Sequence, residues 1–275
     1  MKNKGTLYLV PTPIGNLQDI TLRALEILKT VDVIGAEDTR NSGYLLKHFE
    51  IGTPLISYHK FNEKKRSSEL VKRLVNGENI AIISDAGSPG ISDPSAEITQ
   101  QAIAAGVRVE ALAGATAFVP ALTASGLPAE RFYFIGFLPN KKKDKDQLLI
   151  RLKDCPDTLI FYISPHDIKS FVQDLHYHLG NRAITLAREL SKIHEEYIRT
   201  SIEELTNGQE IILRGEFVAV VAGREKIPVS DESLQEQIAD LHEAGHSNRE
   251  IMDRLSAQEN VSANRIKKLL YSVSK

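Results

Sequence analysis

The sequence predicts an α/β fold: two α/β domains with a ligand cleft between them, followed by a small helical module. Three observations predict it. Short apolar runs alternate with helical patterns through most of the chain, several of these runs end in loops rich in Gly, Ser and Pro, and the composition changes after Gly223. Such alternation of strand and helix is typical of a mostly parallel sheet that is covered on both faces.

The first domain is expected over residues 1–127, where strands and helices alternate. Leu22, Leu25 and Leu28 recur at helical spacing and form one apolar stripe, which supports a helix there. The expected strands are Thr6–Val10, Val31–Ala36, Leu55–Ser57, Asn79–Ser84 and Val107–Leu112. The expected helices are Leu22–Lys29, Ser42–His48, Lys64–Val75, Ala96–Ala105 and Phe118–Ser125.

A second α/β domain is expected over residues 128–226, because Ser125–Pro128 interrupts the pattern. Its basic segment Lys141–Lys145 is expected in the loop after its first strand. The expected strands are Phe132–Phe137, Thr158–Ile163, Ala183–Ala187 and Phe217–Gly223. The expected helices are Asp144–Lys153, Asp167–Leu179 and Ile202–Leu205.

The last part, residues 227–275, is expected to be helical at Asp231–Glu243, from Ser247 through Leu255, and at Ser262–Tyr271. Ser247 and Glu250 have the spacing of a capping box. Two short helices with a turn near Asn260 are typical of a helix-turn-helix. Either the last helix contacts RNA or DNA, or the module packs on the body or on a second subunit.

The segment Ser84–Pro94 is the strongest candidate for a ligand-binding loop, because it follows a buried strand and precedes a helix. Gly87 and Gly90 permit backbone conformations that other residues avoid and let the chain approach a ligand closely. Asp85 and Asp93 supply hydrogen-bond acceptors. The alternative for this segment alone is a tight turn with a helix cap.

Two more loops of small residues, Pro11–Asn16 and Ala113–Ala117, also follow predicted strands and precede predicted helices. All three loops are therefore expected at the edge where α/β sheets bind ligands. The chain lacks the Gly-x-Gly-x-x-Gly and Walker patterns, so neither a dinucleotide nor a triphosphate fingerprint supports the site.

Composition and charge narrow the classes of function. There is no long apolar run, so we expect no membrane span. Cys155 is the only cysteine, which excludes an intrachain disulfide and fits a reducing, cytoplasmic location. The eight histidines have no metal-ligand spacing, and we expect no metal site.

The net charge of −2 argues weakly against a nucleic-acid partner, because phosphate contacts need Lys and Arg. Basic clusters at Lys64–Arg66, Lys141–Lys143 and Arg265–Lys268 qualify that argument. Each cluster taken alone is typical of solvated surface.

Five segments match a known family in order over about residues 5–225: Leu9–Leu17, Ala36–Arg40, Ser84–Pro94, Ala187–Lys192 and Gly215–Phe217. Through them the chain resembles the tetrapyrrole-methylase superfamily of S-adenosylmethionine-dependent methyltransferases. It is most similar to the branch that methylates the ribose 2'-hydroxyl of a cytidine in bacterial 16S ribosomal RNA. One departure is Ser95, which stands where this branch often has Gly.

The resemblance implies that S-adenosylmethionine binds in the cleft between the two domains, without a metal. It also implies a homodimer that acts on 16S ribosomal RNA in the 30S ribosomal subunit. The residues expected to bind the cofactor are Pro13, Gly15, Asp85, Gly87, Ser88, Pro89, Gly90, Ile91, Ser92, Asp93, Gly114, Ala115, Thr116, Ala117, Tyr162, Ala187 and Ala222.

Methyl transfer to a ribose hydroxyl is an in-line displacement that benefits from a base or a cation near the oxygen. Glu37, Asp38 and Arg40 follow a buried strand and offer both, although a helix cap with a surface ion pair is an alternative. Arg188 and Lys192 offer a similar mixture in the second domain, or could hold RNA phosphates instead.

Two other functions remain open from the sequence. A tetrapyrrole C-methyltransferase would share the cofactor cleft, but it does not need the basic clusters or the helical module. A non-catalytic RNA-binding or assembly protein would need no intact loop at Asp85–Asp93.

Overall fold

The computed structural model describes residues 3–212, 214–225, 230–256 and 261–273. Contacts divide the chain into two compact units, Met1–Gly223 and Arg224–Lys275. The larger unit holds two sheets, and the smaller unit is helical. Among the described residues, no helix combines the length and the apolar character needed to cross a membrane.

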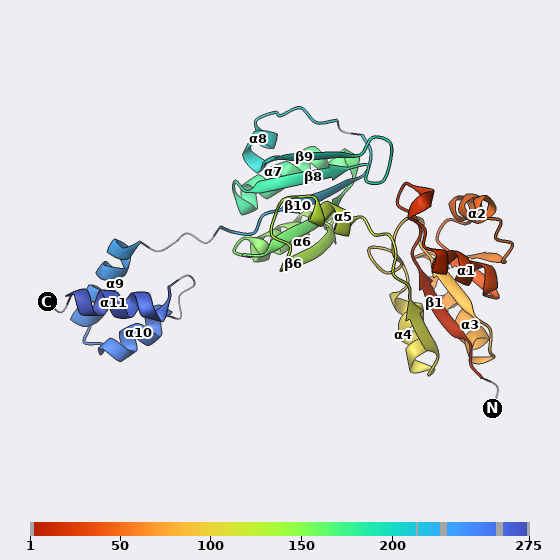
Figure 1. Cartoon of the computed structure of the whole chain (residues 1–275), viewed down its shortest axis with the longest axis horizontal. Coiled ribbons are helices and arrows are strands. Elements are labelled where there is room, and N and C mark those ends of the chain that lie inside the picture. The colour runs from red at the N-terminus through yellow and green to blue at the C-terminus, as the bar shows by residue number, and fades with distance from the viewer. Residues whose placement is uncertain (1–2, 213, 226–229, 257–260, 274–275) are drawn as a thin grey trace. The chain divides into compact units, whose positions relative to one another are not determined.

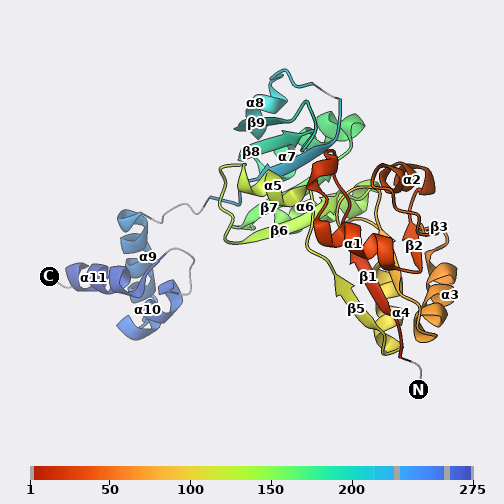
Figure 2. The same ribbon diagram turned by 45° about the vertical axis from the view of Figure 1, so that its right-hand side comes forward.

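Within the described residues the first sheet has five parallel strands in the order β3–β2–β4–β1–β5. Its strands β2 and β4 are buried along their whole length, because helices cover both faces. Figure 2 shows β3 beside β2 at one edge. The strands are β1 (Thr6–Val10), β2 (Val33–Ala36), β3 (Leu55–Ser57), β4 (Ile80–Ile83) and β5 (Arg108–Ala111).

Two helices cover each face of this sheet (Figure 1). On one face α1 (Leu22–Thr30) and α2 (Thr39–His48) pack their buried leucines against β1, β2 and β4. On the other face α3 (Glu63–Val75) packs Leu70 and Leu74, and α4 (Ala96–Ala104) packs Ile98 and Ala102, against the same strands. The expected alternation of strand and helix is confirmed, with boundaries that shift by up to three residues.

The second sheet is mixed, in the order β6–β7–β10–β8–β9. Strands β6 and β7 are parallel, whereas β10 runs antiparallel to both of its neighbours. Strand β9 was not expected from the sequence, because its alternating pattern is weak and four of its six residues are polar or charged, as is common at a sheet edge. The strands are β6 (Phe132–Phe137), β7 (Thr158–Ile163), β8 (Ala183–Arg188), β9 (Glu196–Ser201) and β10 (Phe217–Val221).

Helices α6 (Lys142–Leu152), α7 (Ile168–Leu179) and α8 (Ile202–Thr206) pack on one face of the second sheet. The short helix α5 (Phe118–Thr123) packs on the other face. The expectation that Lys141–Lys145 forms a loop is wrong, because Lys141 is the N-cap of α6 and the next residues form its first turn. Lysine is a good helix former, and burial of Leu149 anchors the helix on the sheet.

The smaller unit consists of α9 (Asp231–Glu243), α10 (Asn248–Ser256) and α11 (Ala263–Val273). Ser247 and Glu250 make the reciprocal bonds of the expected capping box, with the Ser247 N–H donating to Glu250 Oε2 at 2.8 Å and the Glu250 N–H donating to Ser247 Oγ at 3.4 Å. The expected turn near Asn260 and the boundary at residues 226 and 227 lie outside the described residues. The three helices share a core of Leu234, Ile238, Ile251, Leu255, Val261, Ile266, Leu269 and Leu270.

Candidate functional site

Hydrogen bonds tie together the loops that follow β1, β4 and β5. Thr12 and Gly87 exchange two backbone hydrogen bonds of 2.9 Å, which joins the first two loops. The Ser84 hydroxyl donates to the Gly87 carbonyl at 2.8 Å, and the Ser88 hydroxyl donates to the Ala115 carbonyl at 3.0 Å. The three loops therefore form one connected surface at the carboxyl edge of the first sheet.

The loop after β4 requires glycine at two positions. Gly87 has φ of 84° and Gly90 has φ of 88°, which L side chains rarely adopt. Ser92 has φ of 67° although it is not glycine, an arrangement that costs on the order of 1–3 kcal/mol and is concentrated at functional sites. A Cβ on Gly90 would lie 2.6 Å from the Ser95 hydroxyl oxygen, so the departure at Ser95 fills the space beside Gly90.

A cavity of about 370 Å³, called the donor cavity below, lies between this surface and the second sheet. Its volume falls in the range of small-molecule sites, and most of its lining is apolar with a few polar groups. The first sheet contributes Ile14, Asp85, Ala86, Gly87, Ser88, Ile91, Ser92, Asp93, Thr116 and Ala117. The second sheet contributes Phe137, Tyr162, Ile163, Ser164, Pro165, Ala187, Leu190, Glu216, Phe217 and Val218.

The donor cavity brings together ten of the seventeen residues expected to bind the cofactor: Asp85, Gly87, Ser88, Ile91, Ser92, Asp93, Thr116, Ala117, Tyr162 and Ala187. Pro13 and Gly15 line a second cavity, which also contains Asp85. The remaining loop residues Pro89, Gly90, Gly114 and Ala115 lie in the same loops but outside the lining.

The expectation for Ala222 is wrong. Strand β10 runs antiparallel to β7, so its first residues, Phe217 and Val218, reach the donor cavity. Ala222 follows the opposite end of the strand, where its N–H donates to the Ala183 carbonyl at 2.9 Å. Strand direction also explains why Glu216 and Phe217 were not expected as lining residues. Because β10 runs antiparallel to β7, the start of β10 and the end of β7 lie at the same edge of the sheet.

Three carboxylates, Glu37, Asp85 and Asp93, form an acidic group that borders the donor cavity. Burial, followed by the nearby charges of Glu37 and Asp85, raises the pKa of Asp93 to about 7. Burial and then Asp85 also raise the pKa of Glu37. Such a group attracts a cation and exchanges a proton near neutral pH.

Asp38 and Arg40 form the helix cap and surface ion pair that the sequence left as an alternative. The Asp38 carboxylate accepts from the Arg40 N–H and from its guanidinium, both at 2.8 Å. These bonds lower the pKa of Asp38 to about 2. The Asp38 N–H in turn donates to Asp85 Oδ1 at 3.0 Å, so the start of α2 orients one member of the acidic group.

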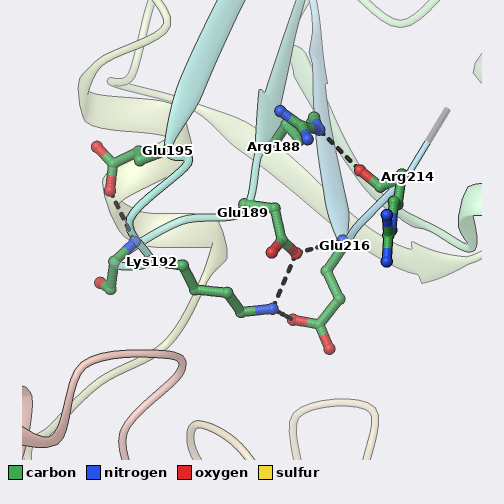
Figure 3. Close-up of polar contacts among 7 residues, drawn as sticks. Arg188, Glu189, Lys192, Glu195, Arg214 and Glu216 are labelled. Carbon is green, nitrogen blue, oxygen red and sulfur yellow. Dashed lines mark hydrogen bonds and ion pairs between the residues drawn. The ribbon is translucent and has the colours of Figure 1, made fainter. Parts of the chain in front are cut away.

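The ammonium of Lys192 is held between two carboxylates (Figure 3). Its Nζ lies 2.9 Å from Glu189 Oε1 and 3.0 Å from Glu216 Oε2. Glu189 Oε1 also accepts from the Glu216 N–H at 2.8 Å. Glu189 and Ser191 both have positive φ, of 51° and 62°, so this loop is a second strained segment beside the cavity.

Gly15 places the loop after β1 against the Lys192 segment. A Cβ on Gly15 would lie 2.4 Å from Lys192 Cγ and 3.1 Å from the Leu190 carbonyl oxygen. The two loops can meet this closely only because residue 15 has no side chain. The contact joins the two sheets next to the donor cavity.

Arg188 is only 8% exposed. Its Nε donates to the Arg214 carbonyl at 2.7 Å, and its Nη1 donates to Glu196 Oε2 at 3.2 Å. A role in holding RNA phosphates does not fit this geometry, since the guanidinium is buried and bonded within its own domain.

We expect Arg188→Met to destabilise the protein, because it leaves the Arg214 carbonyl without this donor. The loss should be about 1–3 kcal/mol, a drop in Tm of several degrees in scanning calorimetry. Unchanged Tm with a large fall in kcat would instead assign Arg188 to catalysis.

The described residues contain no group of three or more His, Cys, Asp or Glu residues that could hold a metal ion.

Comparison with known proteins gives consistent results. The sequence profile of the tetrapyrrole (corrin/porphyrin) methylases matches residues 6–206. The ribosomal RNA small subunit methyltransferase I of Halalkalibacterium halodurans is 46% identical over 245 residues, which are 89% of this chain and 85% of that protein. The Bacillus subtilis (strain 168) protein of the same name is 42% identical over 265 residues, which are 94% of this chain and 91% of that protein.

A solved structure shares the fold. It is uroporphyrin-III C-methyltransferase from Thermus thermophilus complexed with S-adenosylhomocysteine, with a TM-score of 0.55 and 20% identity. The likeness covers 78% of this chain and 97% of that chain.

Proposed function

We propose, from the premise that this chain belongs to the tetrapyrrole (corrin/porphyrin) methylase family, that it methylates the ribose 2'-hydroxyl of a cytidine in 16S ribosomal RNA. As a member of this family the chain is an S-adenosylmethionine-dependent methyltransferase. The observation that carries the proposal is the donor cavity, where three connected loops of the first sheet face the second sheet.

The residues of the donor cavity fit S-adenosylmethionine. Phe137, Tyr162 and Ile163 offer apolar surface for an adenine ring, and the loop backbones at Gly87 and Thr116 approach closely enough to bond polar groups. The acidic group suits the positive charge of a sulfonium. The cofactor supplies an activated methyl group when it is bound.

Transfer to the hydroxyl breaks the sulfur–carbon bond as the oxygen–carbon bond forms, and the hydroxyl proton leaves. The protein contributes alignment, because the connected loops fix one reactant beside the other. Asp93 in its ionised form would accept the proton, since its pKa of about 7 leaves it basic at the pH of the cell.

The start of α6 is the surface that we assign to RNA phosphates. Lys141, Lys142 and Lys143 are exposed and follow β6, whose last residue, Phe137, lines the donor cavity. Cations at a helix N-terminus oppose the helix dipole, so three of them together suggest an anionic partner. In the smaller unit, Arg265 is paired with Asp231, and Lys267 and Lys268 are exposed on α11.

The proposal includes a homodimer in the cytoplasm that acts on the assembled 30S subunit. These parts are supported by the family resemblance, and light scattering of the purified protein tests the first of them. A monomeric mass at micromolar concentration would contradict the dimer.

A methyl-transfer assay with labelled cofactor tests the function. The substrates compared are naked 16S RNA, 30S particles and a tetrapyrrole precursor, and the labelled product is digested to nucleosides. We expect label in 2'-O-methylcytidine, with 30S particles as the better substrate. Label in the tetrapyrrole, or cofactor binding without transfer to any substrate, would overturn the proposal.

We expect the double charge reversal Lys142→Glu/Lys143→Glu to raise KM for 30S particles about tenfold and to reduce the slope of log KM against log salt by roughly 1–2. The matched control is Lys64→Glu/Lys65→Glu, which makes the same charge change in the first turn of α3. Equal effects of both pairs would show that only the overall charge matters.

A further inference from the structure

A second cavity, called the α2 cavity below, lies beside the donor cavity. Its volume is about 420 Å³, and the residues used here are Leu17, Ser42, Tyr44, His48 and Asp85. Asp85 lines both cavities, so the two share a wall. A molecule that spans this wall would place one part near a methyl donor and another part against α2.

The α2 cavity contains an unused polar group. Ser42 is 4% exposed, and its hydroxyl has no hydrogen-bond partner among the described residues. A buried hydroxyl without a partner destabilises a fold, so its presence calls for a reason. Rotation about χ1 would turn this hydroxyl toward a ligand in the cavity that Ser42 lines.

Exposed aromatic side chains line part of the same cavity. Tyr44 is 78% exposed, and His48 lies one helical turn further along α2, so the two side chains share a helix face. Leu17, at the start of the 3₁₀ turn Leu17–Asp19, adds exposed apolar surface from the loop after β1. Exposed rings beside a cavity are suited to stacking on a planar ligand.

We propose that the α2 cavity binds the nucleobase of the acceptor nucleotide, withdrawn from the RNA stack, while its ribose lies at the wall formed by Asp85. This inference rests on the proposed function. A ribose hydroxyl can reach a methyl group in the donor cavity only if the nucleotide binds at an adjoining site. Enzymes that act on single nucleotides commonly take them out of the stack and hold the base between aromatic and polar side chains.

The chemistry of the wall favours cytosine among the bases. Its exocyclic amine is a donor that a carboxylate accepts, and Asp85 is the carboxylate common to the two cavities. The Ser42 hydroxyl can donate to a ring nitrogen or a carbonyl of the same base. Uracil has a carbonyl acceptor in place of the amine, and this oxygen would repel the Asp85 carboxylate.

The test measures KM for 30S particles, the dissociation constant for S-adenosylmethionine, and Tm for variants at Ser42 and Tyr44 and for one control. We expect Ser42→Ala to raise KM about 3–10-fold, as for one lost hydrogen bond, with unchanged cofactor affinity and an unchanged or higher Tm. Tyr44→Ala should raise KM roughly 5–100-fold through lost stacking, and Tyr44→Phe should restore most of the loss. The matched control is Tyr177→Ala, which removes an 83% exposed tyrosine of α7 that lines neither cavity.

Wild-type KM in both Ser42→Ala and Tyr44→Ala, together with formation of 2'-O-methylcytidine by the wild-type protein, would overturn the base-binding site and leave the proposed function standing. Absence of that product from the wild-type protein would overturn the proposed function, and this inference with it. A changed mass of Tyr44→Ala in light scattering would reassign the aromatic face to contact between copies of the chain.

Discussion

Binding of S-adenosylmethionine should tighten as pH rises through about 7, and Asp93→Asn should remove most of that dependence. The pKa of Asp93 is raised to about 7 by burial and by the charges of Glu37 and Asp85. Below this pH the carboxyl is neutral and attracts a sulfonium less strongly. One pH unit below the pKa, only about a tenth of the carboxyl is ionised, so affinity should fall by up to about tenfold per unit.

S-adenosylhomocysteine provides the control for this prediction, since it lacks the positive charge on sulfur. Its affinity should vary much less over the same pH range, and isothermal titration calorimetry measures both ligands. An equal pH dependence for the two ligands would show that Asp93 does not face the sulfur.

The same group should affect the stability of the ligand-free protein. Because its folded-state pKa lies above its ordinary value of 3.8, the folded state holds more protons than the unfolded state between about pH 4 and 7. The stability due to this proton is therefore lost progressively as pH rises from about 4 to about 7. Asp93→Asn should raise Tm most at about pH 8, less at about pH 5 and little at about pH 4, and Glu37→Gln should show the same sign.

The sequence predicted the parts of the site that local chemistry determines. Gly87 and Gly90 mark a loop whose backbone needs positive φ, and that requirement is visible in the residues themselves. The alternation of apolar runs and helices predicted the parallel first sheet for the same reason, since a strand buried on both faces is apolar throughout.

Strand order and direction were not predictable in this way. The acidic group arises because β2 and β4 are neighbours in the sheet, which brings Glu37 close to Asp85 across 47 intervening residues. The expectation for Ala222 failed because β10 runs antiparallel to β7 and β8. That direction depends on strand pairing across the whole domain, which local sequence does not reveal. The ion pairs of Lys192 with Glu189 and Glu216 depend on the pairing of β10 with β8, because Glu216 directly precedes β10.

Gly87→Val should weaken cofactor binding by roughly 10–100-fold, the equivalent of about 1–3 kcal/mol of backbone strain. Gly87 has φ of 84°, which a β-branched residue adopts only with strain. To relieve it the loop must move, and the paired bonds between Gly87 and Thr12 and the bond from Ser84 would be lost or lengthened. These bonds connect the loops that form one wall of the donor cavity, so the cavity changes shape.

The matched control is Gly52→Val, because no atom lies within 4 Å of a Cβ at Gly52 and its φ is not in the left-handed region. Calorimetric titration with S-adenosylmethionine should give wild-type affinity for the control and a large loss for Gly87→Val, accompanied by a lower Tm. Wild-type affinity in Gly87→Val would mean that the cofactor is held without this loop. Binding would then depend on the remaining lining residues, at Thr116 in the first sheet and at Tyr162 and Ala187 in the second.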